Sequence, residues 1–261
     1  ADELKERVRT ELFRAGLTDA AIKLEGARIG TVNSVCGRLV TDFAIELGLS
    51  PELRVLDQEQ SRVALRKVIS KVVTKAERDQ LSDIAGRFDR DFSWQEAVRG
   101  VVDYARANRI DGEGLDRSAE RSIKELLQAL PDPVGTAEER DREMLQVLEA
   151  YPALLDPSDD TKATKEAVYS VSELLSGLRF GPGRWPAWGK AKTAKPGKKS
   201  AAAFVRIKEL AGEVDTHPLL RKDLQEMVGL VFAVGRRTLE AYQGEKRELG
   251  VLDFVDQEVR A

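Results

Sequence analysis

Apolar residues recur every three or four positions along most of this chain, which is the period of an amphipathic α-helix. Leu4, Val8 and Leu12 share one face of residues 2–15 in this way. From residue 57 onward the pattern repeats, interrupted by short connections rich in Pro and Asp. We expect helices at residues 57–73, 76–86, 94–108, 114–129, 137–151, 163–178, 201–213 and 217–243. The pattern therefore predicts a mostly α, multi-helix protein.

Residues that suit helix N-caps stand where several of these helices are expected to begin. Asp57 and Ser93 each precede an apolar-periodic segment. Thr136 is followed three residues later by Glu139, which is the spacing of a capping box. Asp160 or Thr161 fits the start of the next helix. These local signals support the predicted boundaries.

One segment near the front differs from the helical pattern. Residues 27–32 read as a short strand that passes through an Asn33-Ser34 turn into a helix starting near Ser34 and ending at Gly48. A strand, a small polar turn and a helix start together present free backbone N–H groups and the positive end of the helix dipole. This arrangement suits a phosphate-bearing ligand. Residues 51–56 are expected to be extended as well.

Composition limits the kinds of chemistry that the chain can carry. Of the 261 residues 33% are charged and 6% are aromatic, and the formal net charge is −3. The single cysteine, Cys36, excludes an internal disulfide and a cysteine-based zinc cluster, and we expect it to be buried on a helix. No apolar run is long enough to span a membrane, and no signal peptide opens the chain. We therefore expect a cytoplasmic protein with no membrane partner.

Charge is unevenly distributed. Residues 174–208 contain nine Lys and Arg and no Asp or Glu, so the rest of the chain carries −12. Glycines and prolines predict a loop at 179–200. Lysine and arginine side chains can neutralise phosphates, and tryptophan can stack on unpaired bases or pack into a helical core. The candidate DNA contacts of this loop are Arg184, Trp185, Trp188, Lys190, Lys192, Lys195, Lys198 and Lys199.

Tests for catalytic constellations are negative. Gly189-Lys190-Ala191 and Gly197-Lys198-Lys199-Ser200 both fail the phosphate-loop pattern, which needs an earlier glycine and a hydroxyl directly after the lysine. His217 has no nucleophile in a recognisable setting, so we expect a surface histidine near a helix start. Paired carboxylates at 138–139 and 159–160 are expected to complement helix dipoles. We predict no catalytic residue, no metal site and no ATP hydrolysis by this chain alone.

Several segments resemble the UvrD/Rep-type DNA helicases of superfamily 1. Residues 29–39, Ile-Gly-Thr-Val-Asn-Ser-Val-Cys-Gly-Arg-Leu, resemble the family's "GT-x-HSFC-x-RLL" motif, with Asn33 where a histidine is common. Tyr242, Lys246 and residues 252–256, Leu-Asp-Phe-Val-Asp, resemble its "Y…K…LDFDDL" motif, which in the family precedes the Walker B strand. Residues 1–8 look like the helix that follows the family's "TNKAA" segment, and residues 54–57 resemble its step into the helical insert. Residues 93–108 are similar to the AddA-like and RecB-like branch.

The resemblance implies a division of the chain. Residues 1–55 would be part of a RecA-like 1A domain, 56–245 the helical 1B-like subdomain, and 246–261 a return to 1A, with one or two short strands left from the RecA-like sheet. Thr31, Asn33, Ser34 and Arg38 would contact single-stranded or junction DNA, and Asp253, Phe254 and Asp256 would belong to the second motif. The family's ATP and Mg²⁺ would bind elsewhere in a longer helicase, so we expect an excised piece.

The implied parent is an ATP-dependent DNA helicase acting in DNA repair or recombination, together with the rest of its own chain and a nuclease partner subunit. A lone strand near residues 25–34 would expose unpaired edges, so self-association or disorder is expected there. The competing hypothesis is a non-enzymatic helical module that binds a protein or DNA. A third alternative, an unrelated enzyme, has no assembled nucleophile or metal site in its favour.

Overall fold

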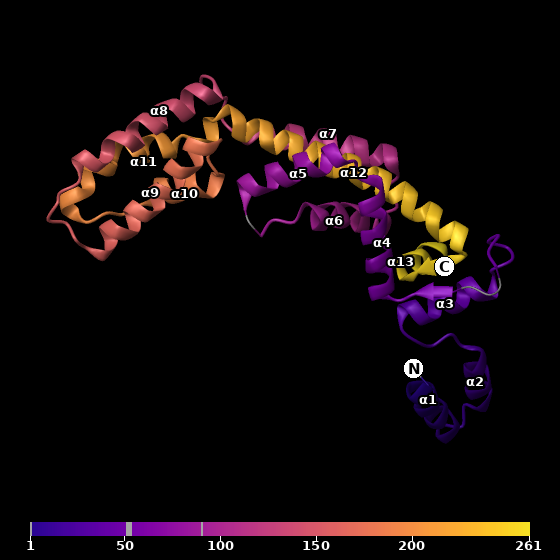
Figure 1. The fold of residues 1–261 in the computed structure, drawn as a ribbon. Coiled ribbons are helices and arrows are strands. Elements are labelled where there is room, and N and C mark those ends of the chain that lie inside the picture. The colour runs from indigo at the N-terminus through magenta and orange to yellow at the C-terminus, as the bar shows by residue number, and fades with distance from the viewer. Residues whose placement is uncertain (1, 51–53, 90) are drawn as a thin grey trace.

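The longest element of the fold is a single helix that links two separate cores. In the computed structural model, which describes residues 2–50, 54–89 and 91–261, α12 (Pro218–Leu249) spans 32 residues. At 1.5 Å per residue it is about 48 Å long. Figure 1 shows it running from one group of helices, through a second group, to the C-terminal elements. The molecule is therefore an elongated arc.

The first core lies where α4 (Gln58–Val72), α5 (Lys75–Phe88), α6 (Trp94–Ala107) and α7 (Gly112–Gln128) pack along α12. Its fully buried side chains follow the helical period that the sequence predicts. They include Val68, Leu81, Ile84, Val98, Val102 and Val234. This first core supports the part of the chain that carries the sequence motifs.

The second core is built by α8 (Ala137–Ala150), α9 (Lys162–Phe180), α10 (Trp185–Thr193) and α11 (Val205–Gly212). Two 3₁₀ segments, Tyr151–Leu154 and Lys198–Phe204, complete it. It encloses Met144, Leu148, Trp188, Phe204 and Ile207. The start of α12 contacts this core through Leu219 and Leu220. Both cores thus depend on the same helix.

A small parallel sheet joins the segment before α4 to the segment after α12. β1 (Arg54–Leu56) pairs with β2 (Val251–Asp253), with Arg54 opposite Val251. Beside it α3 (Val32–Asp42) packs against α13 (Phe254–Arg260). Figure 1 shows α1 (Asp2–Arg14) and α2 (Thr18–Lys23) extending from this end of the molecule, with a 3₁₀ turn at Leu24–Gly26. The prediction of a mostly α bundle with a small remnant sheet is confirmed.

Local capping signals predicted helix starts well. Asp57 caps α4 in a capping box with Gln60, and Thr136 does the same for α8 with Glu139. Ser93 caps α6. At the start of α9 the cap is Thr161, which decides between the two residues that the sequence allowed. Each cap acts within four residues, so it can be recognised without knowledge of the tertiary structure.

The predicted strand at residues 27–32 is wrong. Helix α3 already begins at Val32, with Thr31 as its N-cap, and ends at Asp42; Gly48, at φ +67°, closes the turn that follows. A strand needs a neighbour for its backbone hydrogen bonds, and the two described strands pair with each other instead. The argument for self-association through an edge at 25–34 therefore loses its basis. Residues 51–53 of the predicted extended segment lie outside the described residues.

The predicted loop at 179–200 is also wrong, because it contains α10 and the start of a 3₁₀ segment. Trp185, Trp188 and Ala191 follow one another at helical spacing and are all buried in the second core. Their packing outweighs the helix-breaking tendency of the surrounding Gly and Pro. Within the described part of the chain, no helix has the length and apolar content needed to cross a membrane.

Candidate nucleic-acid interface

The residues of the first motif converge on one pocket beside α3. This α3 pocket, of about 630 Å³, is lined by Thr31, Asn33, Ser34, Gly37, Arg38, Thr41, Asp42, Val55, Phe254 and Gln257. The structure thus brings together all four DNA contacts predicted from the front motif. It also adds Phe254 from the second motif, which lies more than two hundred residues away in the sequence. The pocket is open to solvent on one side, because Thr31, Ser34 and Arg38 are exposed.

The N-terminus of α3 forms one wall of this pocket. The Thr31 hydroxyl accepts a hydrogen bond from the Ser34 amide at 3.3 Å, and the Ser34 hydroxyl donates to the Thr31 carbonyl at 2.9 Å. A Cβ on Gly30 would lie 2.1 Å from the Ser34 Oγ, so glycine permits this tight turn. The other first-turn amides, of Val32 and Asn33, have no partner within a helix. They point outward with the positive end of the dipole.

Two further side chains complete the polar lining. The Oδ1 atom of Asn33 is buried and has no hydrogen-bond partner in the described structure. Arg38, one turn after Ser34, is exposed and makes no ion pair within the described ranges. The Oδ1 atom can only accept a hydrogen bond, whereas the Nδ2 group of Asn33 and the guanidinium of Arg38 can donate to phosphate or base oxygens. The wall therefore offers donors and positive charge together.

Glycine also sets how closely the pocket's two helices approach. A Cβ on Gly37 would lie 2.9 Å from Gln257 Nε2 of α13. Gln257 is buried at this contact. The absence of a side chain at Gly37 therefore lets α13 lie directly against α3, and this contact brings Phe254, the first residue of α13, to the pocket.

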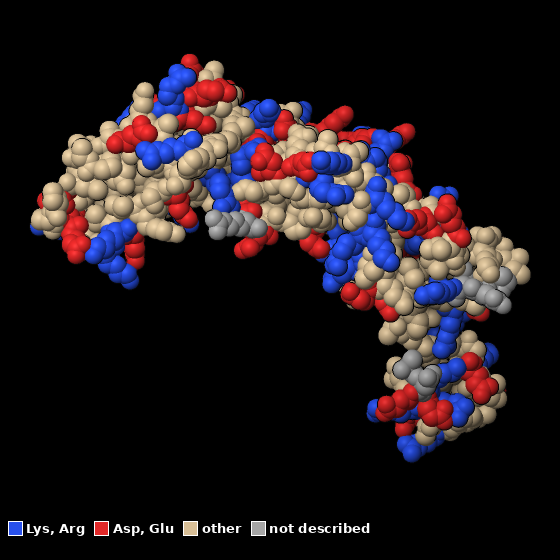
Figure 2. Space-filling model, viewed as in Figure 1, with Lys and Arg blue, Asp and Glu red and all other residues tan. Residues whose placement is uncertain are grey.

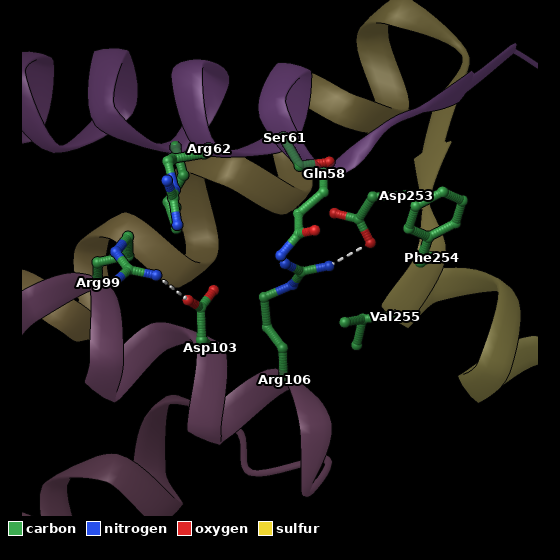
Figure 3. A pocket seen from close by; sticks show the side chains of 10 residues that line it. Gln58, Ser61, Arg62, Arg99, Asp103, Arg106, Asp253, Phe254 and Val255 are labelled. Carbon is green, nitrogen blue, oxygen red and sulfur yellow. Dashed lines mark hydrogen bonds and ion pairs between the residues drawn. The ribbon is translucent and has the colours of Figure 1, made fainter. Parts of the chain in front are cut away.

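A second pocket begins on the other side of Phe254. This arginine pocket, of about 200 Å³, is lined by Gln58, Ser61, Arg62, Leu65, Arg99, Asp103, Arg106, Asp253, Phe254 and Val255. Figure 3 shows Arg62 reaching toward it from α4, and Arg99 and Arg106 from α6. Burial raises the pKa of the Asp103 carboxyl, although the positive charge of Arg99 opposes the shift. Half-buried Phe254 lines both pockets.

The floor of the arginine pocket is a buried ion cluster centred on Asp253. Its carboxylate accepts hydrogen bonds from Tyr242 Oη at 3.0 Å, from Lys246 Nζ at 3.1 Å and from Arg106. Burial by itself would raise the pKa of Asp253, but the charges of Arg106 and Lys246 outweigh it and hold that pKa below its ordinary value. Burial in turn raises the pKa of Tyr242. These shifts favour the carboxylate form of Asp253 and the neutral phenol of Tyr242.

The same carboxylates hold the start of α13. Asp253 is the N-cap of that helix and forms a capping box with Asp256, which also pairs with Lys246. Asp253 and Asp256 are therefore anchors for the segment rather than surface contacts. They fix Phe254, which stands between them in the sequence, at the boundary of the two pockets.

The basic segment 179–200 lies on the second core, at the opposite end of the arc from α3 (Figure 1). Trp185 and Trp188 are buried, and so neither ring can present a face to a base; their predicted stacking role does not fit this structure. Arg184 donates to the Gly86 carbonyl at 2.8 Å, and Lys190 pairs with Glu173 at 2.8 Å. The remaining lysines of the predicted set are exposed: Lys192, Lys195, Lys198 and Lys199.

The prediction for His217 is wrong, because this residue is buried rather than on the surface. It is 1% exposed and lies between the rings of Trp185 and Trp188, each 5.3 Å from its centroid. Its Nδ1 accepts from the Leu219 amide at the start of α12, and its Nε2 lies 3.1 Å from Asp141 Oδ1. The expected position near a helix start is right. Pro218, Leu219 and Leu220 do not indicate that His217 is buried, because its burial depends on Trp185 and Trp188 of α10.

The lone cysteine lies on a helix, and the Asp159 carboxylate accepts hydrogen bonds at the start of one. Cys36 is on α3 and only half-buried. Asp159 precedes its helix and accepts hydrogen bonds from the hydroxyls of Thr161 and Thr164 and from the Ser200 amide. Over the described ranges, no group of three or more His, Cys, Asp or Glu residues is placed to hold a metal ion.

Sequence reasoning missed the arginines of the second pocket. Arg62 of this pocket stands on one predicted helix together with Arg66, which lies outside the pocket lining, and Arg99 and Arg106 stand on another. The spacing within each helix was visible, but their proximity depends on how α4 packs against α6. Nothing in a single sequence specifies that packing.

Comparison with known proteins agrees with the motif resemblance. A model of the UvrD/REP helicase N-terminal domain matches residues 1–260. An ATP-dependent helicase/nuclease subunit of Streptococcus suis (strain 98HAH33) is 27% identical over 151 residues. That alignment covers 54% of this chain but 11% of the relative, so the chain spans a small part of that protein's length. Because the family model covers nearly every residue, this chain belongs to the UvrD/REP helicase N-terminal domain family.

Proposed function

We propose that this chain supplies single-stranded DNA contacts to an ATP-dependent DNA helicase of the UvrD/Rep type. The observation that carries the proposal is the α3 pocket, where the residues of the front motif meet Phe254 of the second motif. The match to the family model supports the helicase assignment. The meeting of the two motifs at the α3 pocket supports the position of the DNA contact.

The lining of the α3 pocket suits an unpaired strand. The amides at the start of α3, the Ser34 hydroxyl and the Arg38 guanidinium are donors for phosphate oxygens. Asn33 can hydrogen-bond a base edge or a phosphate. The Phe254 ring offers an apolar face for a base, and such stacking tolerates any sequence. A pocket with donors on one wall and an aromatic ring on another therefore fits a flexible strand whose bases are free to turn.

The described segments with lysine after glycine do not fit the phosphates of ATP. Gly189-Lys190 lies inside α10, so its amides belong to helix hydrogen bonding. At the other segment the Ser200 amide already donates to the Asp159 carboxylate, and a Cβ on Gly197 would meet that carboxylate at 2.8 Å. A phosphate would be repelled there. We therefore assign ATP and Mg²⁺ to other parts of the longer helicase and derive no step through them.

The similar Streptococcus suis protein is named a helicase/nuclease subunit. We extend the proposal accordingly: the longer protein works with a nuclease subunit, on DNA that is being repaired or recombined. The exposed lysines of the second core are a second surface on which duplex or strand backbone could be held, independently of the α3 pocket.

Binding of a fluorescent single-stranded oligonucleotide, measured by anisotropy over a series of salt concentrations, tests the proposal. The wild-type protein should bind at low salt and lose affinity as salt rises, because lysine and arginine contacts release counterions. Arg38→Gln should weaken binding and reduce the slope of log K against log salt by about 0.7.

The matched control is Arg14→Gln on α1, where the side chain is 71% exposed and pairs only with Glu11 of its own helix. This variant should keep the wild-type slope. The proposal fails if the wild-type protein binds no oligonucleotide at low salt, or if its affinity is the same in half-molar salt.

A further inference from the structure

A basic face lies on α4 and α6, outside the residues that the motifs select. Figure 2 shows Lys and Arg gathered over the position of α4 in Figure 1. The exposed cations on that helix include Arg62, Arg66 and Lys67. Figure 3 shows Arg99 of α6 on the same side of the arginine pocket as Arg62. We name Arg62, Arg66 and Arg99 the arginine face.

Among the described residues, the ion pairs of the arginine face join residues three or four apart on the same helix. Arg62 is 4.0 Å from Glu59, and Arg99 pairs with Glu96 at 2.6 Å and with Asp103 at 3.1 Å. The hydrogen bond from Arg99 lowers the pKa of Glu96, and the charges of Arg62 and Arg66 act in the same direction. Ion pairs between partly or fully exposed residues on one helix contribute little to stability. An incoming phosphate can therefore replace them at little cost.

The arginine face continues directly from the α3 pocket. Arg62 and Arg99 line the arginine pocket, whose boundary with the α3 pocket is Phe254. Arg106 at the floor is already held by Asp253, so the cations free to change partners are those at the mouth. A strand that leaves the α3 pocket past Phe254 therefore reaches these guanidinium groups next.

We propose that Arg62, Arg66 and Arg99 bind the phosphate backbone of the same nucleic-acid strand beyond the α3 pocket. The guanidinium group suits this role, because its planar donors match phosphate oxygens in pairs. The inference rests on the proposed function and adds to it a direction: the strand runs from α3, past Phe254, onto α4 and α6. It adds to the exposed lysines of the second core a further contact surface, one that the sequence did not indicate.

The experiment compares two variants that each remove two arginines spaced four residues apart on an exposed helix. Arg62→Gln with Arg66→Gln alters the arginine face. Arg117→Gln with Arg121→Gln is the control on α7, where both side chains are more than 70% exposed and bound only to residues of their own helix. Oligonucleotide affinity is measured over a salt series, and thermal melting verifies that both variants remain folded.

The face variant should reduce the slope of log K against log salt by about 1.4, which is two contacts at about 0.7 each. The control should keep the wild-type slope. A wild-type slope in the face variant overturns the inference, as does an equal reduction in both variants.

Two further arms separate the causes of a negative result. If Arg38→Gln weakens binding while the face variant does not, the α3 contact stands and only the extension to α4 is wrong. If the face variant loses binding of poly-glutamate as strongly as that of the oligonucleotide, the face recognises acidic chains in general, and the assignment to nucleic acid is overturned. If the wild-type protein binds no DNA, both proposals fall together.

Discussion

Replacing Asp253 with alanine should strongly destabilise the end of the chain that carries the α3 pocket. The carboxylate is 3% exposed and accepts from Tyr242, Lys246 and Arg106. Removing it leaves two buried cations that retain only Asp256 as a shared partner. Breaking a buried pair costs about 3–5 kcal/mol, and losing the α13 N-cap adds about 1 kcal/mol. The expected loss is therefore about 4–6 kcal/mol.

Such a loss is a large share of the 5–15 kcal/mol that typically stabilises a folded domain. Urea unfolding followed by far-UV circular dichroism measures it. Asp253→Asn should lose less, because the amide oxygen can still accept from the Asp256 amide and cap α13, although the amide nitrogen in place of Oδ2 no longer accepts from Tyr242. Oligonucleotide binding should fall in the alanine variant as well, because Phe254 loses its anchor. Thus stability and DNA affinity are expected to decline together.

The control for this prediction is Asp116→Ala, which removes a partner of Arg236 in a half-exposed ion pair on α7 and α12. Its expected effect is below about 1 kcal/mol. A change of less than 1 kcal/mol in Asp253→Ala would refute the reasoning, since it would mean that the cluster contributes no more than a surface pair. Full DNA affinity in a destabilised Asp253→Ala would refute the link to Phe254.

Two other predictions concern the joint between the cores and the response to acid. Arg87→Ala should lower the free energy of unfolding by about 3–5 kcal/mol. It leaves Asp223, 1% exposed, without the two hydrogen bonds of 2.6 and 2.7 Å that Arg87 donates. As a control, Asp83→Ala removes only an exposed partner of Arg87 and should change the urea midpoint little. The Thr161 hydroxyl, with further hydrogen bonds from Ser200 and Thr164, lowers the pKa of Asp159 from 3.8 to about 2. Because the folded state favours its carboxylate, the stability that Asp159 contributes should be present above pH 4 and lost as the pH falls toward 2. Acid titrations of Asp159→Asn should show a shallower loss over that interval; identical titration curves would contradict the assignment.

Sequence reasoning succeeded where the physical cause is local. The N-cap at Asp57, the capping box at Thr136 and the apolar period of α6 act within a few residues, and the structure has them as predicted. The strand at 27–32 failed because its hydrogen bonds would have needed a neighbouring strand. At 179–200 the Gly and Pro content was given more weight than the helical spacing of Trp185 and Trp188, whose burial depends on the rest of the second core.

The candidate site divides in the same way. Thr31, Asn33, Ser34 and Arg38 stand close together in the sequence, so a motif could nominate them as a group. Their meeting with Phe254 depends on the parallel pairing of β1 with β2, which brings residues 54–56 beside residues 251–253. The arginine face likewise depends on contact between α4 and α6. Such proximities are properties of packing and leave no continuous pattern in one sequence.

Because α12 is continuous, the number of its residues between the two cores sets how one core is rotated relative to the other. Leu220 belongs to the second core and Met227 to the first, and no loop separates them. One residue inserted in that interval would rotate everything beyond it by about 100° and advance it by 1.5 Å. Natural variants of this chain should therefore tolerate added residues in the connections between helices far more readily than in this short stretch. An insertion here would change the orientation of one core relative to the other.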